Sequence, residues 1–403
     1  MGNSLPGNNK IYGIMFGFSS ISYYIVRNRT ILKTNMYISR RRTLALLGGG
    51  FIAAAGAGAT AFVTTRTPET ALAPWQKAGS YQDPRKKALS YAILAPNPHN
   101  LQPWMVDLVG ADTVILYRDP DRALPHTDPF SRQITIGLGC FLEQLRIAAT
   151  LTGHRVDLNL FPEGEKGPVA VATFTLGTTP DPLAAQIMHR RSCKEPMQMT
   201  AIESTKVSAL ADYAKIITET DAVEQLRELT WDAWMVEAET PRTLKESVDL
   251  MRMGKAEINA NPDGIDLGGP MLETLILLGV LSREAQLDPD SEASSSAISI
   301  YSKMLAATPA YAVITSSKND RVSQINTGSE WLRLNLKTTE LGLALHPVSQ
   351  ALQEYEEMTA NFARAHQLLA GNGETVQMLG RLGYGPKVAQ TPRWPLEAKL
   401  LNG

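Results

Sequence analysis

The sequence has few of the residues that build disulfide frameworks or metal sites. Its 403 residues include only two cysteines, Cys140 and Cys193, and six histidines that show no metal-ligand spacing. These counts exclude a disulfide scaffold and a zinc site of the usual kind. An organic cofactor is therefore favoured over a metal ion.

An excess of one charge sign is also missing. Charged residues make up 20% of the chain and the formal net charge is −1. Nucleic-acid binders usually carry a basic excess, so no nucleic-acid partner is expected. The length allows a large core and two domain-sized units.

Acidic residues are absent from the first 67 positions, which contain eight basic residues. The basic run Arg40–Arg42 precedes an apolar stretch, Leu44–Val63, in the order of a targeting segment. It resembles a twin-arginine export signal, so we expect export to the periplasm. The alternative is a retained membrane anchor that faces the periplasm, because about 20 apolar residues can span a bilayer. Ala71–Ala73 is a possible cleavage site, although Pro74 follows it, and Met36 is a possible start residue.

A proline-rich stretch is the first candidate site. It lies between an expected helix, Tyr81–Leu94, and an expected strand, Trp104–Val109. Prolines at three positions of this stretch restrict the backbone and disfavour helix. Three amide side chains on this stiff frame can donate and accept hydrogen bonds: Asn97, Asn100 and Gln102. They suit a planar polar ligand; the alternative is a connection whose amides only cap the backbone.

A second candidate site is the alternating set Arg190, Ser192 and Lys194, which follows an expected helix at Asp181–His189. In an extended segment these three side chains point to one side. Two cations with a hydroxyl between them suit a phosphate group. The alternative is an ordinary solvated surface.

The remaining pattern predicts an α+β fold made of two modules. Short alternating segments predict strands at 113–117, 156–161, 169–175 and 311–315, and apolar periodicity predicts long helices at 130–152 and 325–341. Gly137 and Gly139 lie inside the first of these helices, which indicates close packing against a helix or a ligand. We expect an export signal or anchor with its linker at 1–73, a first module at 74–180 and a second at 181–403.

Residues 241–296 fit neither module and are interpreted as an insertion. An apolar helix within them, Leu272–Leu281, could cover the site as a lid. The alternative is a helical pair packed on the outside, and Glu292–Ser296 is expected to be a loose connection.

Both candidate stretches resemble motifs of the nitroreductase superfamily. Pro96–Trp104 is similar to its flavin-contacting loop, Pro-Ser-Ser-x-Asn-x-Gln-Pro-Trp, with the two serines replaced by Asn97 and Pro98. Arg190–Lys194 resembles the Arg-x-Ser-x-Lys/Arg segment that opens the family's modules, and Thr391–Glu397 resembles its C-terminal ending. The resemblance covers roughly residues 80–400 and is closest to the Acg-like branch, in which two modules share one chain.

This resemblance implies a fold, a cofactor and a set of contacts. The fold would be two pseudo-dimeric modules, each a small sheet packed with helices, and the cofactor would be FMN. Arg190, Ser192 and Arg393 would hold its phosphate and ribityl oxygens, and Lys194 would lie near the pyrimidine end of its ring. Backbone groups of Ser349 and Gln350 would lie near N5. The loop would contribute the remaining contacts: Pro96, Asn97, Pro98, Asn100 and Gln102.

Each half-motif occurs once, in different modules, so the resemblance implies one FMN per chain in a monomeric pseudo-dimer. The expected activity is ping-pong electron transfer from NADH or NADPH to a small-molecule acceptor such as a quinone or nitroaromatic compound. The flavin would carry the chemistry, without a catalytic side chain. The alternatives are a flavin-sequestering protein with a closed lid and a scaffold that binds no flavin.

Overall fold

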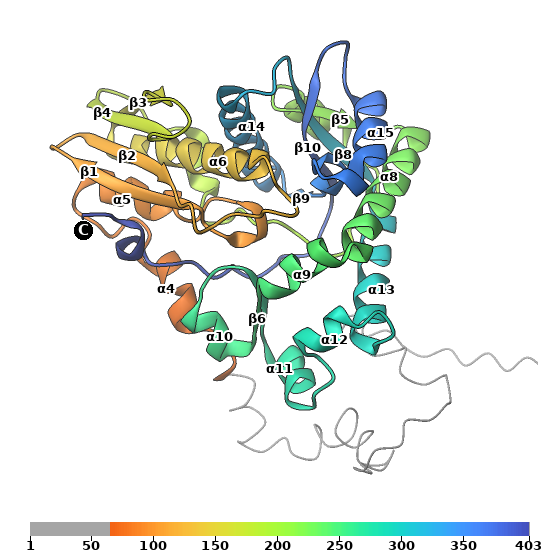
Figure 1. Cartoon of the computed structure of the whole chain (residues 1–403). Coiled ribbons are helices and arrows are strands. Elements are labelled where there is room, and N and C mark those ends of the chain that lie inside the picture. The colour runs from red at the N-terminus through yellow and green to blue at the C-terminus, as the bar shows by residue number, and fades with distance from the viewer. Residues whose placement is uncertain (1–64, 403) are drawn as a thin grey trace, which may run out of the picture. The chain divides into compact units, whose positions relative to one another are not determined.

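Two antiparallel sheets of four strands each organise the computed structural model, which describes residues 65–402 (Figure 1). The expectations for the export signal, the anchor and the start at Met36 concern residues outside this range. The described part falls within one compact unit that begins at Ala61.

The first sheet has the strand order β1-β2-β4-β3. Its strands are β1 Trp104–Val109, β2 Thr113–Arg118, β3 His154–Leu160 and β4 Ala170–Leu176. Each agrees with an expected strand to within two residues. Buried and accessible residues alternate along β2 and β4, so one face of the sheet packs on the core.

The second sheet repeats this order as β5-β8-β10-β9. Its strands are β5 Lys215–Ile217, β8 Ala310–Ser316, β9 Ala344–Pro347 and β10 Thr375–Gly383. In both sheets a long helix follows the second strand and leads to the strand at the far edge. The last strand of the module then fills the gap between these two. The expected α+β fold with two similar modules is confirmed.

Those two long helices, α6 Arg132–Ala149 and α14 Arg321–Glu340, pack directly against each other between the sheets (Figure 1). Their backbones touch at glycines. A Cβ atom on Gly139 would lie 2.2 Å from the Ile325 carbonyl oxygen, and one on Gly328 would lie 2.0 Å from that of Ile136. The expected close packing at Gly139 is therefore a helix–helix contact.

Five further helices cover the sheets: α4 Glu69–Lys77, α5 Pro84–Ala92, α7 Ser204–Leu210, α8 Thr220–Glu239 and α15 Thr359–Leu369. Short 3-10 turns complete the connections: η2 Pro98–Asn100, η3 Thr150–Thr152, η4 Pro182–Gln186, η5 Ser349–Leu352, η6 Glu356–Met358 and η7 Leu396–Lys399. The helix expected at Asp181–His189 was wrong, because only the short turn η4 forms there, capped by the Asp181 carboxylate.

The insertion has its own secondary structure, seen below the sheets in green and teal in Figure 1. It contains α9 Pro241–Asp249, β6 Met251–Met253, α10 Gly254–Ala260, β7 Ile265–Leu267, α11 Pro270–Leu277, α12 Arg283–Leu287 and α13 Glu292–Ala306. Strands β6 and β7 form a parallel pair. The loose connection expected at Glu292–Ser296 is instead the first turn of α13, because the Ser291 hydroxyl caps it.

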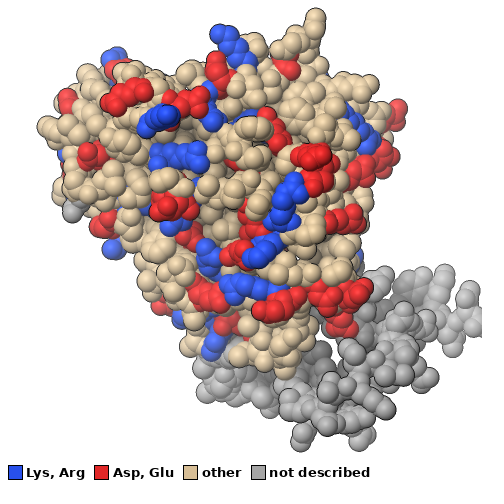
Figure 2. All heavy atoms as spheres, in the orientation of Figure 1, with Lys and Arg blue, Asp and Glu red and all other residues tan. Residues whose placement is uncertain are grey.

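The larger apolar core draws on both modules, and a second cluster fills the space between the second sheet, α8 and α15. Among the described residues, one helix, Arg132–Thr152, is long and apolar enough to cross a bilayer, but most of it is buried in this core. Figure 2 shows Lys and Arg side chains interspersed with Asp and Glu over the visible face, without a large region of one sign.

Candidate functional site

The loop between α5 and β1 is conformationally strained. His99, Asn100 and Gln102 have φ angles of 46°, 54° and 55°, in the left-handed region. Such conformations cost non-glycine residues roughly 1–3 kcal/mol each and persist only where the surroundings enforce them. A loop that holds three of them within four residues is a candidate functional segment.

Hydrogen bonds to the amides enforce this conformation. The Asn97 side-chain oxygen accepts from the Gln102 backbone N–H at 2.7 Å, and its nitrogen donates to the Ala95 carbonyl at 3.1 Å. Asn100 Nδ2 donates to the Pro392 carbonyl at 3.1 Å, and its Oδ1 accepts from Arg393 Nη1 at 2.6 Å. The first amide closes the loop, and the second fixes it to the C-terminal tail.

Gln102 links the loop to two further segments. Its buried side chain donates through Nε2 to the Pro262 carbonyl at 2.7 Å and accepts through Oε1 from the Trp394 backbone N–H at 2.9 Å. Pro98 packs on α6, where a Cβ atom on Gly137 would lie 3.0 Å from the Pro98 Cδ. Pro96 is half-buried beside it. The loop amides are thus engaged with protein groups.

Two buried arginines from opposite ends of the second module meet at the end of this loop. Arg190 Nη2 and Arg393 Nη2 donate to the same acceptor, the Leu94 carbonyl oxygen, at 3.0 and 3.1 Å. Arg190 also contacts Asn335 Oδ1 at 3.3 Å, and Arg393 also contacts Thr391 Oγ1 at 2.6 Å. The structure therefore brings together the basic segment, the C-terminal tail and the loop.

Neither guanidinium forms an ion pair with a carboxylate of the described residues, and Asp266 acts on Arg393 only from beyond ion-pair distance. Both arginines are only 3% exposed, and the Nε atom of each is buried without a hydrogen bond. Burial and the Arg191 charge lower the pKa of Arg190 to about 10, and burial and the Arg190 charge lower the pKa of Arg393 to about 9. Both stay charged at neutral pH. Buried like charges are costly unless an anion compensates them.

Trp75 and Arg191 complete this end of the site. The Arg191 guanidinium lies 4.5 Å from the centroid of the Trp75 ring, and that of Arg393 lies 5.9 Å from it. The indole N–H of Trp75 donates to the Thr391 carbonyl at 2.8 Å. Helix α4 therefore supports the arginines through cation–π contacts.

Ser192 and Lys194 extend the site away from the arginines. Ser192 is half-buried and Lys194 is exposed, and neither makes a hydrogen bond or ion pair with the described residues. Burial first and the Lys194 charge second lower the pKa of His99 to about 4. Burial, then the Arg381 charge, and last the Lys194 charge hold the pKa of His346 well below its usual value. Both imidazoles are therefore neutral at pH 7.

Asp266, from strand β7 of the insertion, faces the same region. Burial raises the pKa of its carboxyl, whereas the charges of Lys194 and Arg393 lower it. Yet its side chain is accessible to solvent. Its carboxylate is thus close enough to Lys194 and Arg393 to interact with both charges.

Ser349 and Gln350 lie on turn η5, after strand β9. The buried Ser349 hydroxyl donates to the Leu379 carbonyl at 3.3 Å, so it fixes the turn to β10. Gln350 lines a small cavity of about 20 Å³ with His346 and Tyr301. Arg381 donates to His346 Nδ1 at 3.2 Å, which leaves Nε2 as the protonated nitrogen of this neutral ring.

The insertion is clamped onto the loop and the tail. The Asp263 carboxylate pairs with Arg122 at 2.6 Å and with Arg252 at 2.6 Å, and it accepts from the Trp394 indole N–H at 2.7 Å. The Gly264 backbone N–H donates to the Asn100 carbonyl at 3.3 Å. The turn before β7 therefore covers the segment that carries Asn100.

Sequence reasoning missed several residues of this arrangement: Trp75, Arg191, Asp263, Asp266 and Trp394. Arg191 stands inside a segment already singled out, and Trp394 follows Arg393, so adjacency was an available signal. Asp263 and Asp266 lie in an insertion without a family motif, and only the fold reveals their contacts.

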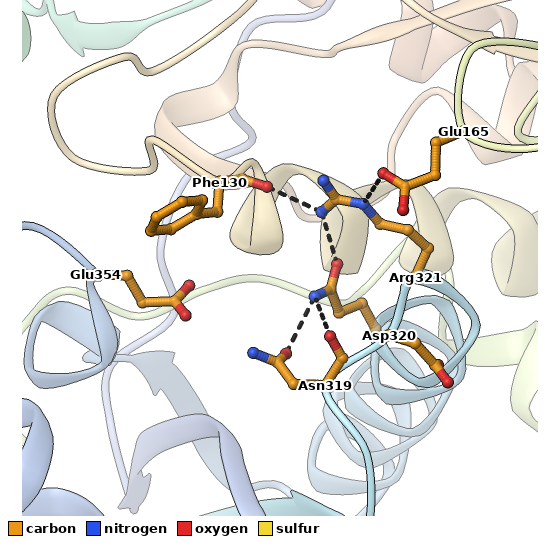
Figure 3. Close-up of a pocket in the computed structure, with 7 residues that line it drawn as sticks. Phe130, Glu165, Asn319, Asp320, Arg321 and Glu354 are labelled. Atoms are coloured by element: carbon orange, nitrogen blue, oxygen red, sulfur yellow. Dashed lines mark hydrogen bonds and ion pairs between the residues drawn. The ribbon is translucent and has the colours of Figure 1, made fainter.

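A larger cavity, of about 350 Å³, lies elsewhere (Figure 3). Arg321 and Gln324 of α14 line it together with Asn319 from the preceding turn, and Phe130, Glu165 and Glu354 complete the wall. Arg321 pairs there with Glu165 at 2.9 Å. None of the expected site residues lines this cavity. No cluster of three or more His, Cys, Asp or Glu side chains suited to a metal occurs among residues 65–402.

Comparisons with known proteins identify relatives. A "putative NAD(P)H nitroreductase" of Mycobacterium tuberculosis strain H37Rv is 24% identical over 336 residues, which cover 77% of this chain and 92% of the relative. The "putative NAD(P)H nitroreductase acg" of the same strain is 36% identical over 77 residues, or 19% of this chain and 23% of the relative.

Comparisons with solved structures and with family profiles give weaker similarity or none. A putative nitroreductase from Anabaena variabilis aligns with a TM-score of 0.37 at 13% identity, over 68% of this chain and 69% of that one. No protein-family profile matches the chain. The similarity to the first mycobacterial protein spans most of both chains, and the resemblance to the nitroreductase superfamily is confirmed.

Proposed function

We propose that this chain is an FMN-dependent oxidoreductase of nitroreductase type. The observation that supports this most strongly is the pair of buried arginines, Arg190 and Arg393, which share the Leu94 carbonyl and lack a carboxylate partner among the described residues. A terminal phosphate would supply the missing charge and accept from the unpaired Nε–H groups.

The neighbouring residues fit the rest of such a cofactor. The unengaged Ser192 hydroxyl would bind ribityl or phosphate oxygens, and Lys194 would lie toward the ring, where its cation favours negative charge on a reduced flavin. The neutral His99 and His346 would add no second positive charge there. The η5 turn with Ser349 and Gln350 would present backbone N–H groups, held in place by the bond from Ser349 to β10.

When bound, FMN would supply the two-electron chemistry: acceptance of a hydride from NADH or NADPH and transfer to a small organic acceptor, in ping-pong order. The protein would bind and orient the cofactor. Quinones and nitroaromatic compounds are the acceptor classes that fit this chemistry. Export to the periplasm, or anchoring with the body in the periplasm, is part of the same proposal.

A second function, flavin sequestration, is favoured by the clamp on the insertion. Asp263 holds the insertion with two ion pairs and an indole hydrogen bond, next to the loop expected to touch the flavin. A cover held this firmly would keep substrates from the cofactor and leave little catalysis.

The test is the absorbance of the purified full-length chain. An oxidoreductase should show a flavin spectrum that NADPH or NADH bleaches without air and that a quinone restores. A flavin spectrum that neither nucleotide bleaches would support sequestration. If the protein binds no added FMN, both proposals are refuted. Denaturing release should give one FMN per chain; two per chain would refute a single site between the modules.

A further inference from the structure

Helix α11 of the insertion has the reverse of the usual polarity. Its one buried side chain is a carboxylate, Glu273, while its leucines and isoleucine are half-buried or exposed. A surface helix of a soluble protein normally buries its apolar stripe and exposes its charges. Here Glu273 pairs with Arg66 at 3.0 Å and accepts from the Lys255 backbone N–H at 3.1 Å.

The apolar side chains of α11 and the turn after it form a patch, defined by Met271, Leu277, Leu278 and Val280. Their exposed fractions are 41%, 74%, 46% and 41%. Single exposed apolar residues are common, but four within ten positions mark a surface that binds an apolar partner. Nothing in the described chain covers them.

The N-terminal apolar run ends three residues before Arg66, which contacts helix α11. Leu44–Val63 contains no charged residue and is long enough to span a bilayer. Three residues after its end, Arg66 forms the ion pair with Glu273, and the Thr65 carbonyl accepts from Lys255 Nζ at 2.8 Å. Three residues reach at most about 10 Å. A bilayer that holds the run would therefore lie close to α11.

The folded body also argues that the run stays attached. Ala71, in the possible cleavage site, is buried within α4. Its N–H donates to Asn259 Oδ1 at 3.1 Å, and its carbonyl accepts from the Arg393 backbone N–H at 2.9 Å. Cleavage after Ala73 would remove half of α4 and release the backbone of Arg393. A protein exported in its folded state presents no extended chain there to a peptidase.

We propose that the chain remains anchored in the bilayer through Leu44–Val63 and rests the α11 patch on the membrane surface, at the boundary between headgroups and acyl chains. The partner is the lipid surface itself. Charges of both signs surround the patch, with Arg283 paired to Glu257 at 2.6 Å. Contact with acyl chains therefore drives the docking, and anionic headgroups are not required.

The test places a polarity-sensitive nitrobenzoxadiazole dye at Leu277→Cys in the full-length chain, reconstituted in phosphatidylcholine vesicles. The native cysteines, Cys140 and Cys193, are buried and should not label. The matched control is Leu176→Cys, because Leu176, at the end of β4, is also 74% exposed and also a leucine. In the vesicles, the emission of the dye at 277 should shift to the blue. Spin labels placed on the lipid near the headgroup should quench this emission. The dye at 176 should show neither change.

Other results would overturn the proposal. Equal behaviour of the two dyes would mean that the patch does not meet lipid. Shielding at 277 that persists in mild detergent would assign the patch to the chain's own N-terminal run, and shielding that grows with protein concentration would assign it to a second copy. Intact-mass measurement of exported protein tests the anchor separately, because a chain that begins at residue 74 has none.

Discussion

Two arrangements of buried arginine in this molecule differ in one respect, the presence of a carboxylate. Arg132, at the start of α6, is 1% exposed; it pairs with Glu354 at 3.2 Å and donates to the Gln377 carbonyl at 2.8 Å. Arg190 and Arg393 are buried as deeply, but they donate only to neutral oxygens and each leaves its Nε unpaired. The first arrangement is complete without a ligand, whereas the second lacks an ion-paired anion and has only the more distant Asp266 as a counter-charge.

This difference separates structural from ligand-binding arginines. A paired buried arginine contributes to the fold through its partner, and its removal leaves polar groups unsatisfied. Arg190 and Arg393, without an ion pair and with Nε unsatisfied, lower the stability of the empty protein, and we interpret them as ligand-binding residues. Burial and residue type are the same, so neither could distinguish the two arrangements without the contacts.

The largest expected effect is on folding stability. Arg132→Met should lower the free energy of unfolding by about 3–5 kcal/mol, the usual result of breaking a buried ion pair from one side. Arg190→Met, the matched control, should leave the stability of the FMN-free protein unchanged or raise it. Urea unfolding of both variants measures this. Equal losses would mean that Arg190 is a structural residue and that the comparison fails.

A buried carboxylate without a cation sharpens the comparison, because it can take up a proton near neutral pH, whereas the two arginines keep theirs there. Glu237 accepts hydrogen bonds from Gln353 at 2.9 Å and from Ser247 at 3.4 Å. Burial raises the pKa of its carboxyl from 4.5 to about 7, against the smaller opposing effect of these two bonds.

The sign of the pH dependence follows from this shift. The folded state holds the proton of Glu237 more tightly than the unfolded state does. The resulting contribution to the free energy of unfolding is fully present below pH 4.5 and is lost as the pH rises through 7. The loss amounts to about 3 kcal/mol for a shift of this size. Urea unfolding of the wild type and of Glu237→Gln between pH 4.5 and 8 tests it. The contributions of the other titrating groups cancel in the difference between the two free energies of unfolding. A difference that stays constant with pH would show that Glu237 does not titrate in this range.

The third effect is on cofactor affinity. Arg190→Met and Arg393→Met should each weaken FMN binding by about 1.5–3 kcal/mol, roughly 10- to 150-fold, for one lost charged hydrogen bond. Arg321→Met is the control, because that arginine is paired with Glu165 at the cavity of Figure 3. Titration of FMN into apo-protein measures all three. Unchanged affinity in the first two variants would place the phosphate elsewhere.

Much of the fold could be predicted from the sequence. The alternation in β1–β4 and the periodicity of α6 and α14 are local signals, and each of these elements was predicted to within four residues. The parallel pair β6–β7 could not be predicted, because its strands have only three residues each and are stabilised by contacts with the rest of the chain. The turn η4 was mistaken for a helix, since apolar spacing over nine residues does not distinguish the two.

For the site, the sequence identified the chemistry but not the partners. Arg190 and Arg393 were singled out as phosphate ligands from motifs 200 residues apart, and the fold brings them to one carbonyl oxygen. Which amides remain free for a ligand could not be predicted. Asn97 is engaged within its own loop, and Asn100 and Gln102 find partners in the tail and the insertion. Their assignment as flavin contacts stays a prediction.

The smallest effect concerns Asn100, which connects the strained loop to one of the unpaired arginines. Because its Oδ1 accepts from Arg393 Nη1 at 2.6 Å, Asn100→Ala should free the guanidinium to reorient and weaken FMN binding by about 1 kcal/mol, the value of one ordinary hydrogen bond. Asn100→Asp is the informative partner variant: it keeps the acceptor but places a carboxylate against Arg393, which gives that arginine the partner that Arg132 already has. The aspartate variant should therefore bind FMN more weakly than the alanine variant while unfolding at a higher urea concentration in the apo form. If instead the two variants bind FMN equally and the flavin midpoint potential falls, Asn100 acts on the flavin ring directly, and the missing charge at Arg393 is not what holds the cofactor.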